Sequence, residues 1–226
     1  GAVAVACAVA LGWISLASSP AIASVEVVGA RHVRTGQAIA QSALLEMPAF
    51  LASAADAAAR LRALPAVREA RVEIALPSSA KIALVEREAI GRWITSDGLQ
   101  WFVDANGVLF PSNDPGAAPQ LRVVDERPAR RAGDRLDPAL VQVALRLAAI
   151  APGELRADAT TPRTVMTAGS NALVLRFGTG WEIRFGGPEA FDEKLALVKR
   201  YLRDNPTRRL DYVDVRSADR IVVSPQ

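Results

Sequence analysis

Few residues in this sequence have the side-chain chemistry of a catalyst or a metal ligand. The chain of 226 residues has one histidine, His32, and one cysteine, Cys7, which lies inside an apolar N-terminal run. A Ser-His-Asp triad would have to use His32, and nothing in the spacing of the chain supports one. A disulfide after the apolar run and a cysteine-based metal site both lack partners. We therefore interpret His32 as a structural or surface residue and expect neither a metal nor a cofactor.

Paired carboxylates are the remaining route to hydrolysis, because two of them can cleave a glycosidic bond. Glu86 with Glu88, and Asp97 with Asp104, are the candidate pairs. Both pairs fall where the pattern predicts hairpins and turns, in which such residues favour exposed positions. The glycine-rich stretches at 178–180 and 186–187 lack the spacing and the lysine of a phosphate-binding loop. We expect no enzymatic activity, and a glycan-hydrolysing enzyme remains an open alternative.

The composition indicates a mixed, soluble surface around one or two cores. Half of the residues are hydrophobic and the formal net charge is +3. So small a positive excess argues against a nucleic-acid-binding protein, which usually carries a basic stripe. Two arginine clusters stand out, Arg127, Arg130, Arg131 and Arg135, and Arg200, Arg203, Arg208 and Arg209. We interpret them as solvated faces or as contacts near an anionic membrane or wall polymer.

The N-terminal run has the composition of a membrane-spanning helix. No charged residue occurs before Glu26, and about 20 apolar residues suffice to cross a bilayer. A secretory signal peptide is the competing interpretation, because Ala21-Ile22-Ala23 resembles a cleavage site. The sequence starts at Gly1, so we expect a cytoplasmic tail to be missing, and the distribution of positive charge cannot be tested. Under both interpretations everything after residue 25 is exported.

Two helices are predicted after a short strand at 24–28. The first spans 36–46 and is capped by Thr35, with Ile39 and Leu45 facing inward. The second is capped by Ser53 and Asp56 and ends before Pro65, and its apolar face is Ala57, Leu61 and Leu64.

A β-hairpin is predicted next. Val72, Ile74 and Leu76 alternate with polar residues and share one face, and Ile82 and Leu84 do the same after a turn. The first part is thus an α+β unit of order β-α-α-β-β, in which two amphipathic helices cover a three-stranded sheet.

The second part is predicted as a mixed antiparallel sheet with two or more helices. Strand candidates occur at 91–95, 100–104, 107–110, 121–124, 163–167, 172–177 and 181–185. One helix begins after Asp137 with Pro138 at its first position, and another spans about 189–204. A strand, a turn at 217–219 and a final strand at 221–223 close the chain.

Several phrases of the sequence resemble the FtsQ/DivIB family of bacterial cell-division proteins. They are Val25, Val27, Gly29 and Val33; Glu86-Arg87 with Ala89 and Trp93; Trp101 to Phe110, with Val103, Asp104 and Gly107; and Val213-Asp214-Val215-Arg216. The resemblance covers nearly the whole chain. It implies a transmembrane anchor at 1–23, a polypeptide-transport-associated (POTRA) domain at 24–88 and the family's C-terminal β domain at 89–226.

The resemblance also implies a function without catalysis. Such a protein is a single-pass scaffold at the division septum whose exported domains bind FtsB- and FtsL-like partners, close to peptidoglycan, by strand addition at the last sheet edge. The partner-binding positions that it implies are Lys199, Arg200, Arg203, Asp214, Val215, Arg216, Ser217, Ile221, Val222 and Val223. Ser217-Ala218-Asp219 departs from the aromatic residue that often follows this phrase in the family.

Three alternatives stay open at this point. The terminal hairpin is an ordinary closing strand in the first. The second is a POTRA-type docking module of an envelope export system, although the chain has neither the repeats nor the barrel pattern that usually accompany one. The third is a wall-processing enzyme, which the missing nucleophile, metal ligands and acid pair disfavour.

Overall fold

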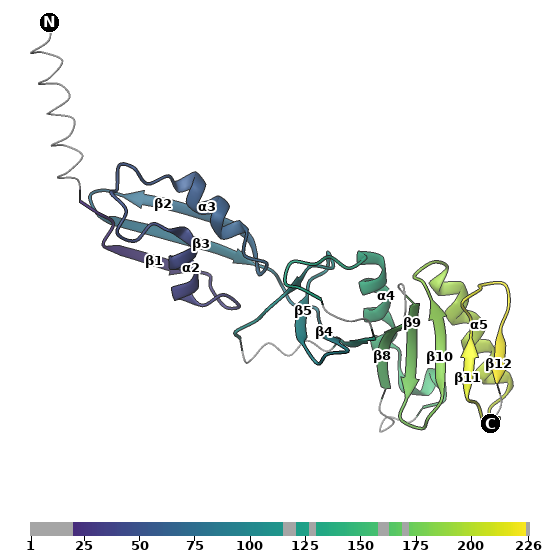
Figure 1. The fold of residues 1–226 in the computed structure, drawn as a ribbon. Helices are drawn as coiled ribbons and strands as arrows, with labels where there is room; N and C mark the ends of the chain where they lie inside the picture. The colour runs from purple at the N-terminus through teal and green to yellow at the C-terminus, as the bar shows by residue number, and fades with distance from the viewer. Residues whose placement is uncertain (1–19, 115–120, 127–129, 158–162, 169–171, 225–226) are drawn as a thin grey trace, which may run out of the picture. The chain divides into compact units, whose positions relative to one another are not determined.

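The computed structural model describes residues 20–114, 121–126, 130–157, 163–168 and 172–224 (Figure 1). The chain divides into two compact units, the first ending at Arg87 and the second beginning at Glu88. Each unit is described by itself.

The first unit is a three-stranded sheet packed against two helices. Its elements, in chain order, are β1 (Ser24–Val28), α2 (Thr35–Ser42), α3 (Ala54–Arg62), β2 (Val67–Ala75) and β3 (Ser79–Glu86) (Figure 1). In the order β1-β3-β2, β1 runs parallel to β3 and β2 antiparallel to it. This arrangement confirms the predicted β-α-α-β-β order.

The second helix of this unit has the predicted cap, whereas the first lacks the predicted cap and ends early. Thr35 is already the first residue of α2, and its N-cap is Arg34, whose side chain makes no capping hydrogen bond. The Ser53 side chain accepts a hydrogen bond from the Asp56 backbone N–H at 3.2 Å. Helix α2 ends at Ser42 and not at Glu46, because Ala43 adopts a left-handed conformation with φ of 52°. The early end turns Leu44 into the core and leaves Leu45 exposed, so the predicted inward position of Leu45 is wrong.

The β2–β3 hairpin follows the predicted alternation except at its tip. Ile82 and Leu84 are buried, and Val72 and Ile74 are half-buried on the same side. Strand β2 ends at Ala75, however, so Leu76 lies in the turn and is 74% exposed. The prediction that Leu76 shares the inner face is therefore wrong.

The second unit is built on a nine-stranded mixed sheet in the order β12-β11-β10-β9-β8-β7-β4-β5-β6 (Figure 1). The pairs β4–β7, β7–β8 and β10–β11 are parallel and the others antiparallel. The strands are β4 (Gly91–Thr95), β5 (Gln100–Val103), β6 (Leu109–Phe110), β7 (Leu121–Asp125), β8 (Arg163–Ala168), β9 (Ala172–Phe177), β10 (Glu182–Gly186), β11 (Tyr212–Asp214) and β12 (Val222–Ser224).

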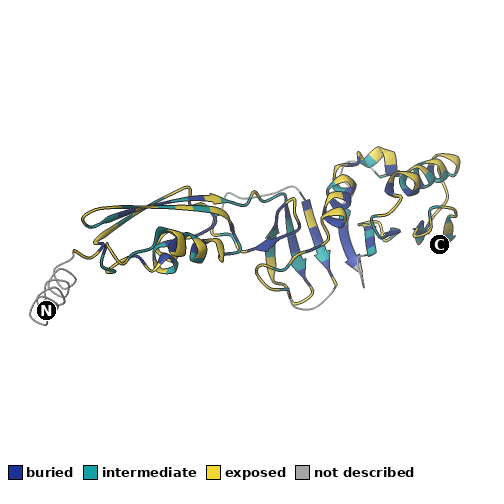
Figure 2. Ribbon diagram, turned by 90° about the horizontal axis from the view of Figure 1, so that it is seen from above, coloured by how far each residue is buried: buried dark blue, intermediate teal, exposed yellow. Residues whose placement is uncertain are grey.

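Two α-helices and one short 3-10 helix complete this unit. They are α4 (Pro138–Ala149), η1 (Pro152–Leu155) and α5 (Phe191–Asp204). The predicted Asp137 cap is present, since its carboxylate accepts from the Ala139 N–H at 2.9 Å. Figures 1 and 2 show α4 and α5 on the same side of the sheet, where Arg146 of α4 pairs with Asp192 of α5.

Figure 2 shows the burial that results, with buried residues concentrated along the strands and the inner helix faces. Leu140, Val143, Ala144 and Leu147 of α4 are buried and form an apolar stripe at helical spacing. In α5, the charged Lys194 is buried, whereas Leu195 is only half-buried. The Lys194 ammonium donates to the Gly187 carbonyl oxygen at 3.1 Å, which offsets the cost of its burial.

Two glycines of the family phrases sit where a side chain does not fit. Gly29 and Gly107 have φ of 82° and 76°, in the left-handed region that L side chains rarely adopt. A Cβ at Gly29 would overlap the Leu84 carbonyl oxygen, and one at Gly107 that of Leu136. Each glycine therefore allows two backbone segments to approach closely.

Candidate partner-binding site

The residues that could have done chemistry have structural roles. The Glu86 carboxylate accepts hydrogen bonds from three backbone N–H groups, those of Arg31, His32 and Val33, at 2.9, 2.6 and 2.9 Å. It thereby fixes the segment that enters α2, and His32 is buried beside it.

The other candidate pair holds two turns. Asp97 accepts from the Thr95 hydroxyl and from the Leu99 N–H, and the hydrogen bond from Thr95 is the main cause that lowers its pKa. Asp104 accepts from the N–H groups of Asn106 and Val108 at 3.0 and 2.8 Å. Within the part of the chain that the structure describes, no cluster of three or more His, Cys, Asp or Glu residues could hold a metal ion.

The end of the sheet at β12 is where the predicted positions of the terminal hairpin come together. Strand β12 is the edge strand and pairs with β11 alone. Cross-strand partners are in register, so Arg184, Asp214 and Val222 form one row, and Glu182, Tyr212 and Ser224 form the next. Side chains alternate between the faces of a sheet, and Ile183 and Val213 of the intervening row are fully buried in the core. The two rows therefore lie on the face opposite the core.

Ion pairs and an aromatic contact order these two rows. The Arg216 Nη2 atom lies 2.7 Å from the Asp214 carboxylate, whose other oxygen accepts from the Arg216 N–H at 3.0 Å. The Arg184 guanidinium lies 4.0 Å from the centre of the Tyr212 ring and 2.8 Å from the Glu182 carboxylate. Positively and negatively charged side chains thus alternate around the Tyr212 ring.

The arginines control the charge state of the two carboxylates. Desolvation raises the pKa of Asp214, but hydrogen bonds from Arg216 and the charges of Arg216 and Arg184 together lower it below its ordinary value of 3.8. Desolvation likewise raises the pKa of Glu182, and Arg184 and Arg176 outweigh it. Both carboxylates are therefore ionised at neutral pH.

A surface pocket of about 530 Å³ is lined in part by residues of these two rows. It is lined by Arg184, Tyr212, Asp214, Arg216, Ser217, Arg220 and Val222. Four of these, Asp214, Arg216, Ser217 and Val222, are among the partner-binding positions that the family resemblance implied. A partner strand added beside β12 would carry its side chains past this pocket.

Three predicted residues of the hairpin, Val215, Ile221 and Val223, face the core, whereas Ser217 both lines the pocket and closes a turn. Val215 is fully buried, so it supports the hairpin from within the core. Ile221 and Val223 are half-buried and pack against the core, whereas Val222 is 44% exposed. Ser217 donates to the Asp219 carboxylate and closes the turn between the strands.

The predicted helix residues do not line this pocket. Lys199 pairs with Glu154 of η1, and the hydrogen bond that it donates is the main cause that lowers the pKa of Glu154. Arg200 lies 3.8 Å from Asp204 along the same helix, and Arg203 is exposed in the last turn. These residues form a separate basic stretch on α5.

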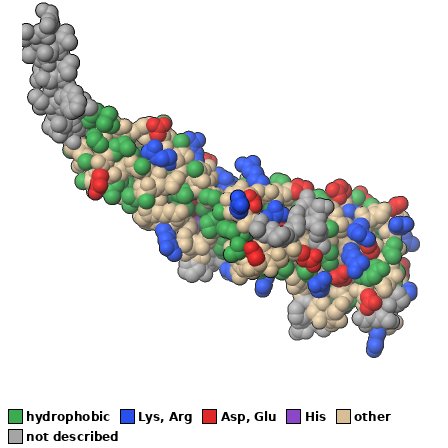
Figure 3. All heavy atoms as spheres, in the orientation of Figure 1, with side chains coloured by type: hydrophobic (Ala, Val, Ile, Leu, Met, Phe, Trp, Pro, Cys, Tyr) green, Lys and Arg blue, Asp and Glu red, His purple; other side chains and the backbone are tan. Residues whose placement is uncertain are grey.

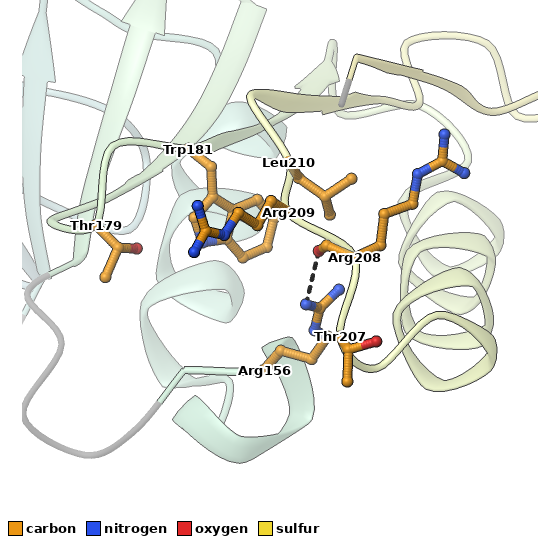
Figure 4. A pocket seen from close by; sticks show the side chains of 7 residues that line it. All are labelled: Arg156, Thr179, Trp181, Thr207, Arg208, Arg209 and Leu210. Carbon is orange, nitrogen blue, oxygen red and sulfur yellow. Dashed lines mark hydrogen bonds between the residues drawn. The ribbon is translucent and has the colours of Figure 1, made fainter. Parts of the chain in front are cut away.

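A brace from η1 holds the segment between α5 and β11. Arg156, just after η1, donates to the carbonyl oxygens of Asn205 and Arg208 at 2.8 and 2.9 Å. Figure 4 shows this guanidinium aimed at the Arg208 carbonyl inside a pocket of about 220 Å³. The pocket is lined by Arg156, Thr179, Trp181, Thr207, Arg208, Arg209 and Leu210. Because this segment leads directly into β11, the brace positions the terminal hairpin.

One arginine of the clusters noted in the sequence has a buried partner. The Arg130 side chain lies 3.4 Å from the buried Asp125 carboxylate. Asp125 also accepts from the Trp93 indole N–H at 2.8 Å, which explains the tryptophan after the Glu-Arg phrase. Arg127 of the same cluster lies outside the described residues.

Arg184, Tyr212 and Arg220 belong to the site but were not predicted. The alternation of β10 indicates that Arg184 points away from the core. Its neighbours could not be inferred, because the parallel pairing of β10 with β11 spans the whole of α5 in sequence.

Comparison with known families agrees with this arrangement. The family described as "POTRA domain, FtsQ-type" matches residues 21–87, and "Cell division protein FtsQ/DivIB, C-terminal" matches residues 91–216. The chain belongs to the FtsQ/DivIB family of cell-division proteins. The FtsQ/DivIB C-terminal match includes β4 through β11 and ends at Arg216, the arginine that pairs with Asp214.

Individual members of the FtsQ/DivIB family align over most of the chain. The cell division protein FtsQ of Chloroflexus aurantiacus is 29% identical over 92% of this chain and 75% of its own length. That of Chloroflexus aggregans is 28% identical over 96% and 78%. That of Caulobacter vibrioides is 26% identical over 86% of this chain and 63% of its own length.

The predicted membrane anchor falls mostly outside the described residues, which begin at Pro20. Among the residues that are described, no helix combines the length and apolar character needed to cross a bilayer.

Proposed function

We propose that this protein is a non-enzymatic, membrane-anchored scaffold of the bacterial division machinery. In this proposal the single-pass anchor lies within residues 1–23, residues 24–88 are the POTRA domain and 89–226 the C-terminal domain, both exported and located at the septum. The charge-free start of the sequence supports the anchor, and membership of a cell-division family supports the role.

The partner is an FtsB- or FtsL-like division protein that adds a strand to β12. One observation carries this proposal, namely that β12 is an edge strand beside the ordered rows of Arg184, Asp214 and Tyr212. An edge strand has backbone N–H and C=O groups without partners in its own sheet, and the side chains next to it select the added sequence. The basic stretch of Lys199, Arg200 and Arg203 on α5 supplies a second contact.

The proposal is tested at the edge strand. Val222→Pro removes a backbone donor from β12, and we expect partner capture by the full-length protein to fall about tenfold, the equivalent of one hydrogen bond. Val222→Thr keeps the backbone donor and the branched shape and serves as the control. The measurement is the amount of FtsB-like protein that co-purifies from dividing cells, with equal expression of each variant.

Two outcomes would contradict the proposal at different levels. Undiminished capture by Val222→Pro would place the contact elsewhere than on β12. Normal septation after depletion of the protein in its source would remove the division role itself. Depletion that produces filaments, rescued by Val222→Thr and not by Val222→Pro, is the expected result.

A further inference from the structure

Two loops of the first unit are fixed beside the point where the described chain begins. The loop between α2 and α3 runs alongside residues 20–22, where the Ile22 N–H donates to the Met47 carbonyl oxygen and the Glu46 N–H to that of Ile22, both at 2.9 Å. Pro48 forms a β-bridge with Ala21. The turn between β2 and β3 lies there too, because the Ala23 N–H donates to the Ser78 carbonyl oxygen at 2.8 Å.

These loops display large apolar side chains to solvent. Leu45, Phe50 and Leu51 are 48%, 48% and 58% exposed, and Leu76 in the β2–β3 turn is 74% exposed. Figure 3 shows hydrophobic side chains gathered over the part of this unit next to the start of the described chain. Four such residues on two loops at one end are more than the scattered single apolar residues of an ordinary surface, and we call them the apolar rim.

The outward orientation of the rim is built into the fold. Leu44 and Ala49 are buried in one cluster with Ile22, and half-buried Ala52 packs against it, so core residues flank both Leu45 and the Phe50-Leu51 pair. The other exposed large apolar residues described in this unit, Val28 and Val85, are less exposed, at 37% and 40%. They lie toward the opposite ends of β1 and β3, since the register aligns Ser24 with Ser79 at the rim and Val28 with Ala83 beyond it.

The charge pattern favours lipid over a charged partner. Glu46 is the only charged residue between 43 and 53, and residues 75–80 carry none. The rim adjoins Pro20, and the charge-free run ends only at Val25. An extended chain covers roughly 3.5 Å per residue. With the embedded segment ending just before Pro20, residues 20–23 lie within about 15 Å of it, and the loops hydrogen-bonded to them stay close to the bilayer.

We propose that Leu45, Phe50, Leu51 and Leu76 form a membrane-contacting rim that inserts into the boundary between lipid headgroups and acyl chains. The rim holds the first unit against the bilayer surface, as apolar side chains of interfacial proteins do. This inference rests on the proposed anchor, because it is the anchor that brings the loops to the membrane.

The experiment uses the full-length chain reconstituted into phosphatidylcholine and phosphatidylglycerol vesicles. Cys7 is the only cysteine, so Cys7→Ser gives a background for single labels at Leu51→Cys and Leu76→Cys. Val28→Cys and Val85→Cys are the matched controls in the same unit. A nitrobenzoxadiazole label on each is quenched with iodide from the water and with doxyl-labelled lipid from the bilayer.

The rim predicts that lipid quenching at positions 51 and 76 exceeds that at 28 and 85 by about threefold or more, with the reverse order for iodide. Equal iodide quenching at all four positions, while a label on native Cys7 is quenched by lipid, overturns the rim and leaves the anchor. A Cys7 label exposed to iodide, with no co-flotation of the protein, overturns anchor and rim together. Protection from both quenchers at 51 and 76 overturns the lipid contact in favour of a second copy of the chain.

Discussion

Glu86 illustrates how a residue that resembles half of a catalytic pair can be fully occupied by the backbone. Its two carboxylate oxygens accept from three consecutive N–H groups of the segment before α2. A carboxylate held in this way joins residues more than fifty positions apart in the sequence. Its value to the protein is the position of that segment, and no proton transfer is required of it.

We expect Glu86→Ala to destabilise the first unit by about 2 kcal/mol, because three N–H groups lose a charged acceptor in a partly buried place. Glu88→Ala, at an exposed position, is the control and should change the stability by less than about 0.5 kcal/mol. Amide hydrogen exchange at residues 31–33 measures the effect directly. Unchanged protection of these amides in Glu86→Ala would show that the segment is held by other contacts.

At the residue scale, the sequence indicated which residues cap helices better than it indicated which side chains contact each other across the fold. The Ser53 and Asp137 caps follow from local rules and are present as expected. Trp93 is fully buried, and its hydrogen bond to Asp125 joins β4 to the end of β7, 32 positions further along the sequence. Nothing local marks Asp125 as buried, because burial of a carboxylate depends on the partners that the fold brings to it.

The terminal hairpin is the element on which the proposed binding depends, and its electrostatics can be tested. Because the pKa of Asp214 is lowered in the folded state, the pair with Arg216 stabilises the hairpin above the ordinary carboxyl pKa of 3.8. That stability is lost as the pH falls through the lowered value. Neutral and mildly acidic conditions therefore leave the hairpin intact.

We expect the Asp214 carboxyl carbon to titrate with a midpoint below 3.8 in the native protein, because Arg216 favours its ionised form. Arg216→Gln should raise that midpoint, whereas Arg203→Gln, on α5, should not. The measurement is the carbon chemical shift of Asp214 by NMR between about pH 6 and pH 2. An equal midpoint in the native protein and Arg216→Gln would contradict the pairing.

At the element scale, the sequence predicted which helices and strands exist and their order, but not where each one ends or how the strands pair. Strong alternation indicated the strands of both units, and the caps Ser53 and Asp137 located α3 and α4, whereas α2 and α5 begin without a side-chain cap. Helix α2 ended early because the left-handed Ala43 interrupts a helical pattern, and alanine gives no sign of this. The parallel pairings β4–β7 and β10–β11 also stayed hidden, since pattern identifies strands without naming their neighbours.

Among the residues that the structure describes, each unit has a hydrophobic cluster of its own. Ile22, Leu44 and Ala57 belong to a cluster of the first unit, and Leu140 and Leu147 to the large cluster of the second. Neither cluster contains a residue of the other unit. Damage to one core should therefore remain in that unit.

Leu61→Ala, at a fully buried position of the first unit, should cost about 3 kcal/mol and increase hydrogen exchange across residues 24–87 only. Leu147→Ala should do the same across residues 91–224 only. Leu45→Ala, which truncates an exposed side chain, is the control for the first unit. Exchange that rises in both units after either core substitution would show that they unfold together.

The place of β12 in the chain has a consequence for timing during biogenesis. Strand β12 pairs only with β11, and β11 joins β10 only after α5 has crossed the sheet. A polypeptide that is still being made consequently lacks the proposed docking edge until every other described element has been synthesised. If partners bind through β12 as proposed, strand addition would report that synthesis had passed residue 222, and a chain stalled earlier would offer β11 in its place.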